Sequence, residues 1–421
     1  MNYLAYKNWL SQHIGVKNRL KNVCIGYILF LMVSVRKHSL DEAERFSGLS
    51  KSAYSKFLKN HSGLAMQSLA NVSRKQAKRI AKALRHLADN KLPWKVAVII
   101  DSTIQKRATR HTDNAQRFNH GKGFVIGHQW TNIIVIVNDM VIPLPPIPFH
   151  TKKYCRKNGL EYKTEHDLVV EYITALYLED YIGTYNPQEV VVLADSGYDD
   201  KRIENAIARK KWKFIIALGK NRSVKSEKTY GDTPQSRGWS QVADLFRNHR
   251  RVKWQTIRIV TNGTKRKRMD FRTRQIIGYL RYVEKVQLIY SEFKKRPDGR
   301  RKYLACNDFK ATPRQIVIGY RLRWFIEIFH KEVKMYLGFE DVSARWFLSV
   351  KAHVYWVYCA YILLHAQPPG MSEQSKSVVE TQRKIRRIID SKEMSRMRLM
   401  LTQFGGVEKY KNELLTALQA L

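Results

Sequence analysis

The sequence predicts an α/β protein preceded by an all-helical region, and three observations support this prediction. One apolar run typical of a strand buried on both faces begins at Val96 and another directly follows Glu189, and each run ends on an aspartate. Segments with helical periodicity alternate with these runs, which is the pattern of a sheet flanked by helices. Residues 1–92, in contrast, carry helical patterns.

The charge of the chain points to a polyanionic partner. The 421 residues include 76 Lys and Arg against 36 Asp and Glu, a formal net charge of +40. Such a charge repels itself unless a polyanion is bound, and nucleic acid is the expected one. A membrane surface is the alternative, but the sequence lacks a basic amphipathic end or a lipidation motif. Hydrophobic residues make up 44% of the chain, which excludes a disordered basic tail.

The cysteines and apolar runs indicate a reducing compartment and no membrane partner. Four scattered cysteines form no CxxC pair, which excludes a zinc ribbon and argues against a disulfide scaffold. The first residues show no signal-peptide pattern. The longest apolar runs, at 23–33 and 354–364, are shorter than the ~18 residues that span a bilayer, so we expect buried helices. The expected location is cytoplasmic.

Changes of pattern divide the chain into five expected segments. After Pro93 strands replace helices, a basic stretch with period-two patterns interrupts the alternation, and helices resume at Pro313. Within that stretch, residues 251–310 hold 18 Lys and Arg against 5 Asp and Glu. We expect a helical DNA-binding domain at 1–92, the first part of an α/β core at 93–219, a β-rich insertion at 220–311, core helices at 312–366, and a basic helical tail at 367–421.

Two helices near the N-terminus resemble a helix-turn-helix. Ser39 and Glu42 form a capping-box pattern, and the helix that they open is expected to end near Gly48. A second helix is expected to start at Ser50. It would carry Lys51, Ser52, Tyr54, Ser55, Lys56 and Lys59 toward the DNA major groove. The alternative is two ordinary packed helices joined by a turn.

Acidic residues supply candidate catalytic groups. Asp101 and Asp195 follow buried strands, and open α/β sheets bind ligands beyond the carboxyl ends of their strands. A third carboxylate, Glu327, belongs to a set spaced by 3, 4, 4 and 3, which predicts one helix face: Tyr320, Arg323, Glu327, Lys331 and Lys334. An ordinary solvated helix face gives the same pattern. Carboxylate oxygens are the ligands of hard divalent cations, and two such ions can drive phosphodiester chemistry.

These residues resemble a known family. The motifs Asp101-Ser102-Thr103 and Asp195-Ser196-Gly197-Tyr198 precede a Tyr-(2)-Arg-(3)-Glu-(6)-Lys spacing that runs from Tyr320 to Lys334. In this order they are similar to the motifs of DDE transposases of bacterial insertion sequences, in the group of the IS-four type. The 132 positions from Asp195 to Glu327 leave room for the β-rich insertion of that group. The resemblance covers about residues 94–365.

The resemblance implies a ribonuclease-H-like mixed sheet in which Asp101, Asp195 and Glu327 hold two Mg²⁺ ions, with Mn²⁺ able to substitute. It further implies cut-and-paste transposition by a nucleoid-associated homodimer that binds transposon ends and target DNA. The expected DNA contacts on the core are Tyr320, Arg323, Trp324, Lys331 and Lys334.

In this resemblance Trp324 is a wedge in the terminal base stack, with Trp239 or Trp254 as candidates to hold the flipped base. A packing argument would instead send Trp324 into the core. Two other functions are open: a Mg²⁺-dependent endonuclease without strand transfer, and a non-catalytic DNA-binding regulator.

Overall fold

The computed structural model describes residues 3–16, 18–34, 37–108, 111–120, 123–227, 238–249, 251–261, 267–295, 301–366 and 378–403. The chain forms two compact units. The first comprises residues 1–72, 332–343 and 348–421, and the second comprises residues 73–331 and 344–347. The boundaries between the units fall within three helices, α5, α13 and α14, which therefore contribute residues to both.

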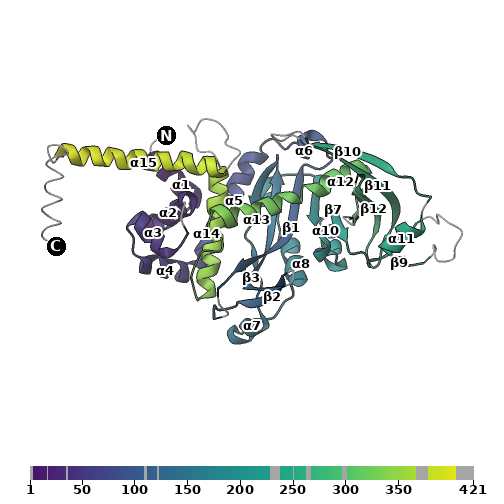
Figure 1. The fold of residues 1–421 in the computed structure, drawn as a ribbon, viewed down its shortest axis with the longest axis horizontal. Coiled ribbons are helices and arrows are strands. Elements are labelled where there is room, and N and C mark those ends of the chain that lie inside the picture. The colour runs from purple at the N-terminus through teal and green to yellow at the C-terminus, as the bar shows by residue number, and fades with distance from the viewer. Residues whose placement is uncertain are drawn as a thin grey trace. The chain divides into compact units, whose positions relative to one another are not determined.

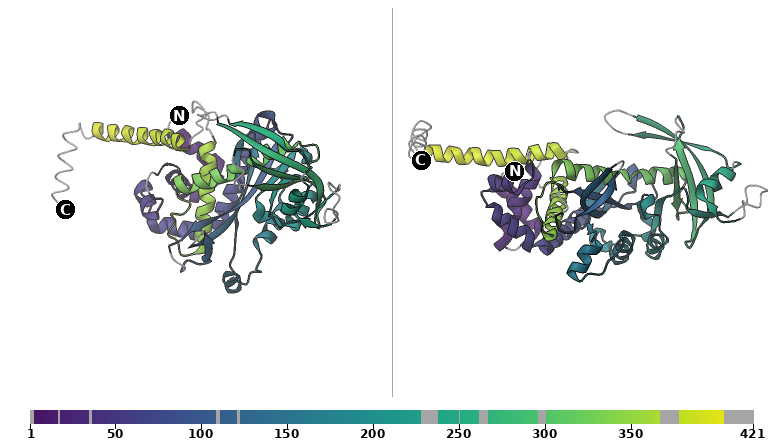
Figure 2. Two further views of the ribbon diagram at one scale, coloured as in Figure 1. Left: turned by 45° about the vertical axis from the view of Figure 1, so that its right-hand side comes forward. Right: turned by 60° about the horizontal axis from the view of Figure 1, so that its bottom comes forward.

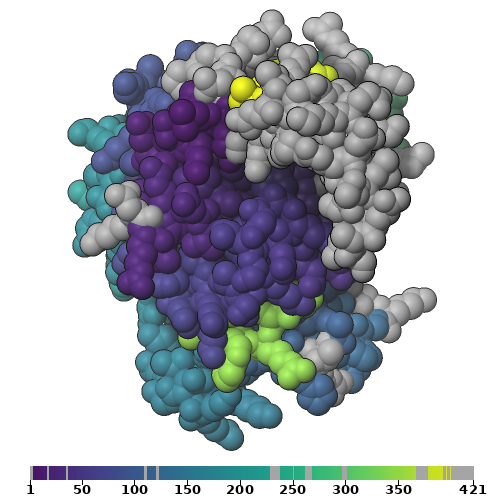
Figure 3. All heavy atoms as spheres, turned by 90° about the vertical axis from the view of Figure 1, so that its left-hand side faces the viewer, coloured from purple at the N-terminus to yellow at the C-terminus, as the bar shows by residue number. Residues whose placement is uncertain are grey.

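Helices make up the described part of the first unit. They are α1 (Tyr3–Ile14), α2 (Asn18–Val33), α3 (Leu40–Ser47), α4 (Lys51–Asn60), the start of α5 (Ser62–Ala81), the end of α13 (Trp324–Tyr336), most of α14 (Phe347–His365) and α15 (Val378–Gln403). In the space-filling view of Figure 3, the purple spheres are atoms of the N-terminal residues of this unit. Residues 367–377 and 404–421, the beginning and the end of the expected tail, lie outside the described residues.

The predicted pair of N-terminal helices is confirmed as α3 and α4. Ser39 and Ser50 cap the two helices, accepting hydrogen bonds from the amides of Glu42 and Ala53. Gly48 ends α3 at φ 73°, a left-handed conformation that costs glycine little. Local capping chemistry therefore fixes this turn.

The expectation that Tyr54 faces DNA is wrong. Its side chain is buried, and its hydroxyl donates to Ser47 Oγ at 2.8 Å. The ring packs 5.5 Å from that of Tyr27. An aromatic ring on a short helix gains more by covering the apolar α2 than by facing water.

Helix α14 is the one helix among the described residues with the length and apolarity to cross a membrane. Within its apolar window, 89% is buried in the protein, as expected for a core helix. The prediction of a buried helix at 354–364 is confirmed.

The second unit is built on one mixed sheet (Figure 1). Its described strands are β1 (Val96–Lys106), β2 (Gln116–His120), β3 (Gly123–Val137), β4 (Met140–Pro143), β5 (Ile147–Pro148), β6 (Val190–Ala194), β7 (Lys213–Leu218), β8 (Ser223–Ser226), β9 (Ser240–Gln241), β10 (Gln255–Thr261), β11 (Lys267–Leu280), β12 (Lys285–Phe293) and β13 (Lys302–Cys306). The order is β2-β3-β1-β6-β7-β13-β12-β11-β8-β9, with β4 and β5 paired to β3 and β10 paired to β11. Strands β1, β6 and β7 are parallel, and the other pairs are antiparallel.

Helices accompany this sheet. They are α6 (Leu87–Asn90), α7 (Lys152–Asn158), α8 (Glu165–Ala175), α9 (Glu179–Ile182), α10 (Lys201–Arg209), α11 (Val242–Asn248), α12 (Pro313–Arg321), the start of α13, and the short 3₁₀ turns η1 (Pro187–Glu189) and η2 (Ser196–Tyr198). The predicted fold class is confirmed: this is a ribonuclease-H-like α/β arrangement with a helical N-terminal region. The strands of residues 220–311 continue the same sheet, because β13 pairs with β7.

The two faces of the sheet bury different helices. Val96, Val98 and Ile100 of β1 belong to a core cluster that also contains residues of α8 and α10. Helix α12 packs on the opposite face, where a Cβ on Gly319 would come within 2.7 Å of the Trp94 ring and 3.0 Å of Ile215. Glycine is needed at that close approach. The teal helices and the green helix on either side of the sheet are visible in Figure 2.

A buried charge cluster ties α10 to the segment after β7. Arg222 contacts Glu204 Oε2 at 2.7 Å and Asp199 Oδ1 at 3.2 Å. Burial raises the pKa of Glu204 to about 8, Arg222 opposes this shift, and the neighbouring Asp199 adds to it. The folded protein therefore retains the Glu204 proton at pH values where the unfolded chain has lost it.

This shift predicts a pH-dependent stability. Folding stability should fall as the pH rises from about 5 to above 8, because an acid with a raised pKa favours the folded state only while it is protonated. Glu204→Gln cannot ionise and should reduce this loss by about 1–3 kcal/mol. Urea unfolding at pH 5.5 and pH 9 measures it, with the exposed Glu161→Gln as control. Equal pH dependence in wild type and Glu204→Gln would contradict the assignment.

Candidate active site

The strand register brings Asp101 and Asp195 together. The parallel ladder of β1 and β6 ends with Ile100 opposite Ala194, so the two aspartates occupy the next position on neighbouring strands. Neighbouring strands lie about 4.8 Å apart. One detail of the prediction is wrong: β1 continues past Asp101 to Lys106, because its pairing with β3 continues.

The predicted single helix from Tyr320 to Lys334 is also wrong in one respect. Helix α12 ends at Arg321 and α13 begins at Trp324. Between them the amides of Leu322 and Arg323 bond to carbonyls three residues earlier, which tightens the backbone into a 3₁₀-like turn.

This turn aims Arg323 at the carboxylates. Its guanidinium lies 3.3 Å from Asp101 Oδ2 and also donates to Glu327 Oε1. One side chain therefore joins two candidate catalytic residues that are 226 positions apart in the sequence (327 − 101). Both side chains are mostly shielded from solvent, with 18% of Asp101 and 33% of Glu327 exposed.

The electrostatics of Asp101 report the proximity of all three acids. Its pKa is raised to about 6, first by burial and then by the charge of Asp195, with a smaller contribution from Glu327. Arg323 acts in the opposite direction. The site thus concentrates negative charge that one guanidinium only partly neutralises.

Tyr320 and Trp324 flank the same turn. Burial raises the pKa of Tyr320 to about 12; Arg323 lowers it, and Asp195 is the largest of the nearby acidic charges that add to it. The Trp324 side chain is 61% exposed, so the packing interpretation of this residue is wrong. Both line a cavity of about 520 Å³ with apolar residues that include Phe271 and Phe293.

The lysines predicted to contact DNA differ in exposure and in their ion-pair partners. Lys331 is exposed in the second unit. Lys334, in the first unit, lies 3.5 Å from Glu340. Lys56 and Lys59 are exposed on α4, and Lys51 pairs with Asp41 at 2.8 Å. Of the candidate aromatic residues in the insertion, Trp254 is covered by the guanidinium groups of Arg272 and Arg274.

Sequence reasoning missed Glu165. One of its oxygens accepts from Thr131 and Tyr198 at 2.9 and 2.7 Å, and the other accepts from Gln129 at 2.6 Å. Tyr198 also interacts with Ser102, next to Asp101. Glu165 thereby joins β3, α8 and the segment that follows Asp195. The Thr164 capping pattern marks the helix start, but no local signal reveals these distant partners.

His166, beside Glu165, fixes the segment that follows Asp195. Its Nδ1 lies 3.0 Å from Asp200 Oδ2, and its Nε2 lies 2.7 Å from the Gly197 carbonyl oxygen. Asp195 Oδ1 itself accepts from the Gly197 amide at 2.8 Å. The sequence suggests a polar loop histidine at this position, and this prediction is wrong, because His166 lies in the first turn of α8.

The donor set suits a hard divalent cation. The carboxylates of Asp195 and Glu327 lie close enough to Asp101 to raise its pKa, and a bound cation would offset this repulsion. In the described part of the chain, no three His, Cys, Asp or Glu side chains form a ready-made metal cluster. Arg323 instead contacts Asp101 and Glu327 in this structure.

The large mixed sheet flanked by helices, with a helical N-terminal region, is consistent with the fold of ribonuclease-H-like transposases. The chain matches the family model of the transposase DDE domain over residues 93–363. The chain belongs to that family, and it is a transposase. A search of curated proteins found no match.

The exposure of Trp324 predicts that its removal leaves the fold intact. Trp324→Ala should change stability by less than about 0.5 kcal/mol, as at other surface sites. Trp130→Ala, at a fully buried position of β3, should cost about 3–5 kcal/mol. Thermal unfolding of both variants checks this. A loss at Trp324 comparable to that at Trp130 would restore the packing interpretation.

Proposed function

We propose that this protein cuts its element out of DNA and joins it to a target, as cut-and-paste transposases of the IS-four type do. The observation that supports this most is the convergence of Asp101, Asp195 and Glu327, with Arg323 bound to two of them. Two aspartates, one on β1 and one directly after β6, and a glutamate on α13 would together suit metal-dependent phosphodiester chemistry.

In this proposal the three carboxylates bind two Mg²⁺ or Mn²⁺ ions. When bound, the ions supply activation of the attacking oxygen and stabilisation of the leaving oxygen. Asp101 is mostly shielded from solvent, and Asp195 is held by the Gly197 amide. Glu327 is positioned through Arg323, and its carboxylate could hold a cation only if the guanidinium released it.

Once free of Glu327, Arg323 would be able to contact a phosphate of the transposon end. Guanidinium groups bind phosphates with paired hydrogen bonds, and Tyr320 beside it offers a hydroxyl. The exposed ring of Trp324 has room to enter the base stack, and the neighbouring apolar cavity is large enough for a base. Lys331 and Lys334 would add contacts to the DNA backbone.

Recognition of the terminal repeats is assigned to the 1–92 domain. The exposed Lys56 and Lys59 lie on the second helix of the helix-turn-helix-like pair. Two ends must be held for coupled cutting, so a homodimer is the expected active species. The remaining expected segments, 93–219, 220–311, 312–366 and 367–421, would then be the catalytic core, its insertion, its closing helices and a basic tail.

One assay separates this proposal from the other two functions. The purified chain is incubated with a duplex that carries the element's terminal repeats, Mg²⁺ and a supercoiled plasmid. Joined products support a transposase that transfers strands, cuts without joining support an endonuclease, and a mobility shift alone supports a regulator.

Substitutions of the carboxylates test the catalytic assignment. Asp101→Asn, Asp195→Asn and Glu327→Gln should each lower cleavage by about three orders of magnitude or more, since each removes a charged metal ligand. Binding of the end, measured by mobility shift, should stay within about threefold. Glu171→Gln, an exposed α8 carboxylate, is the control. Near-normal cutting by any one of the three would refute its role.

The lysines of α4 test the recognition domain. Lys56→Ala with Lys59→Ala should lower the slope of log K against log salt by about 0.9 for each phosphate that the variant no longer neutralises. Lys51→Ala should change the slope less, because Asp41 already neutralises that ammonium group. Binding is measured by fluorescence anisotropy across a titration of the salt concentration. An unchanged slope in the double variant would mean that this helix face does not touch DNA.

A further inference from the structure

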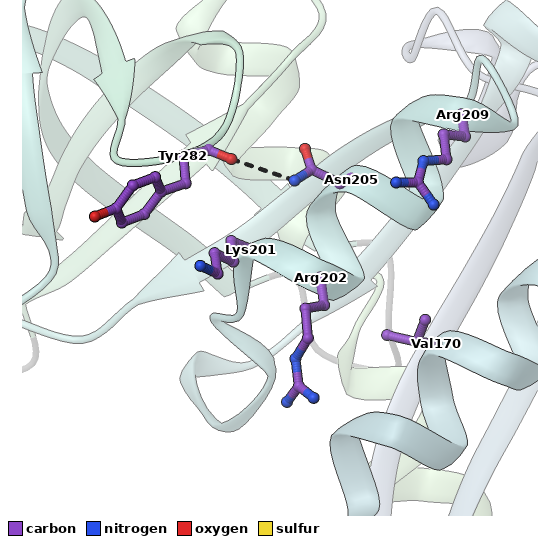
Figure 4. A pocket seen from close by; sticks show the side chains of 6 residues that line it. All are labelled: Val170, Lys201, Arg202, Asn205, Arg209 and Tyr282. Carbon is purple, nitrogen blue, oxygen red and sulfur yellow. Dashed lines mark hydrogen bonds between the residues drawn. The ribbon is translucent and has the colours of Figure 1, made fainter.

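A basic groove on the α8–α10 side of the sheet has no role in the function proposed above. It has a volume of about 350 Å³. Figure 4 shows the residues that line it: Val170 from α8; Lys201, Arg202, Asn205 and Arg209 from α10; and Tyr282 from the turn between β11 and β12.

The polar face of α10 presents cations at a regular spacing. Lys201, Asn205 and Arg209 are four residues apart and share one helix face, while Ile203 and Ile207 are buried. Among the described residues, neither Lys201 nor Arg209 has an ion-pair partner. Arg202 differs, because Asp167 and Asp200 bind its guanidinium. The groove thus offers two cations, about 12 Å apart along the helix, to a partner.

Tyr282 completes the groove in a strained conformation. Its φ of 65° lies in the left-handed region, where a residue with a bulky side chain costs about 1 kcal/mol or more. Asn205 Nδ2 donates to its carbonyl oxygen at 3.2 Å and ties the turn to α10. The ring is 66% exposed, with Lys201 Nζ 4.4 Å and Arg281 5.2 Å from its centroid.

This set of groups matches the chemistry of a DNA backbone. Lys, Arg, Asn and Tyr side chains are common phosphate contacts in protein–DNA complexes. A separation of about 12 Å corresponds to roughly three or four phosphates of one strand. The strained, exposed tyrosine between two cations is hard to explain by packing, because its ring covers little of the core.

The groove lies on the other face of the sheet from the candidate contacts to the transposon end. Asp101 alternates with Ile100 along β1, so its side chain points away from the α8–α10 layer, toward the face of Arg323. Contacts to phosphates do not distinguish one DNA sequence from another. A groove that contacts phosphates alone therefore suits a target of arbitrary sequence.

We propose that Lys201, Arg209 and Tyr282 bind the phosphate backbone of the target duplex. This inference rests on the proposed strand-transfer function and names the surface that holds its second DNA. Binding by this surface should be independent of sequence and should weaken as salt rises.

The test uses the full chain with Lys201→Ala and Arg209→Ala combined. Lys153→Ala with Arg156→Ala, an exposed pair on α7, is the matched control. With pre-cut transposon ends and a supercoiled plasmid, joining should fall about tenfold or more in the groove variant, while cleavage of uncut ends stays within about twofold. For a random duplex, the slope of log K against log salt should become shallower by about 1.8, or about 0.9 for each of the two lost phosphate contacts. Equal joining by the groove variant and the control would overturn the proposal, as would an equal loss of cleavage.

Tyr282→Gly separates a DNA contact from a structural role. Glycine relieves the left-handed strain, so thermal stability should hold or rise while joining falls. A lower melting temperature with unchanged joining would contradict the proposal. If the wild-type protein neither cuts nor joins DNA, the proposed function fails. The salt dependence of binding to a random duplex still tests the groove separately. An equal slope for wild type and the groove variant would mean that the groove does not bind DNA.

Discussion

Repulsion between carboxylates is the constraint on which the second unit depends. Asp101, Asp195 and Glu327 meet in a partly shielded site, and burial together with repulsion raises the pKa of Asp101 to about 6. Arg323 binds two of the three acids, so one positive charge faces three negative ones. A site with such an excess is costly to fold and is poised for a divalent cation. The guanidinium acts as its counter-ion in this structure.

Other features of the fold position these carboxylates and Arg323. The β1–β6 register sets Asp101 beside Asp195, and the 3₁₀-like turn at 322–323 directs Arg323 inward. Gly319 lets α12 approach the sheet closely enough for that turn to reach the strands. Glu165 and His166 hold the segment after Asp195 from the opposite layer.

Local chemistry explains which parts of this structure were predictable from sequence. Capping by Ser39 and Ser50 depends on residues three positions away, and the buried strand before Asp195 is a continuous apolar run, so both were predictable. The break between α12 and α13 was not predictable from sequence. The tight turn at Arg323 is stabilised by contacts with carboxylates that include one far away in the sequence. The contacts of Glu165 with Thr131 and Tyr198 likewise join positions more than thirty residues apart. The residue spacing within a helix does not predict such contacts.

The affinity of Mn²⁺ for the DNA-free protein tests the central claim most directly. Electron paramagnetic resonance counts free Mn²⁺ during titrations of wild type, Arg323→Gln and the neighbouring Arg321→Gln. If the Arg323 guanidinium holds the place of a cation, its removal leaves Asp101 and Glu327 uncompensated, and Arg323→Gln should bind Mn²⁺ several-fold more tightly than the other two proteins. Equal or weaker binding by Arg323→Gln would contradict the account, because the guanidinium would then not compete with a metal ion for these carboxylates.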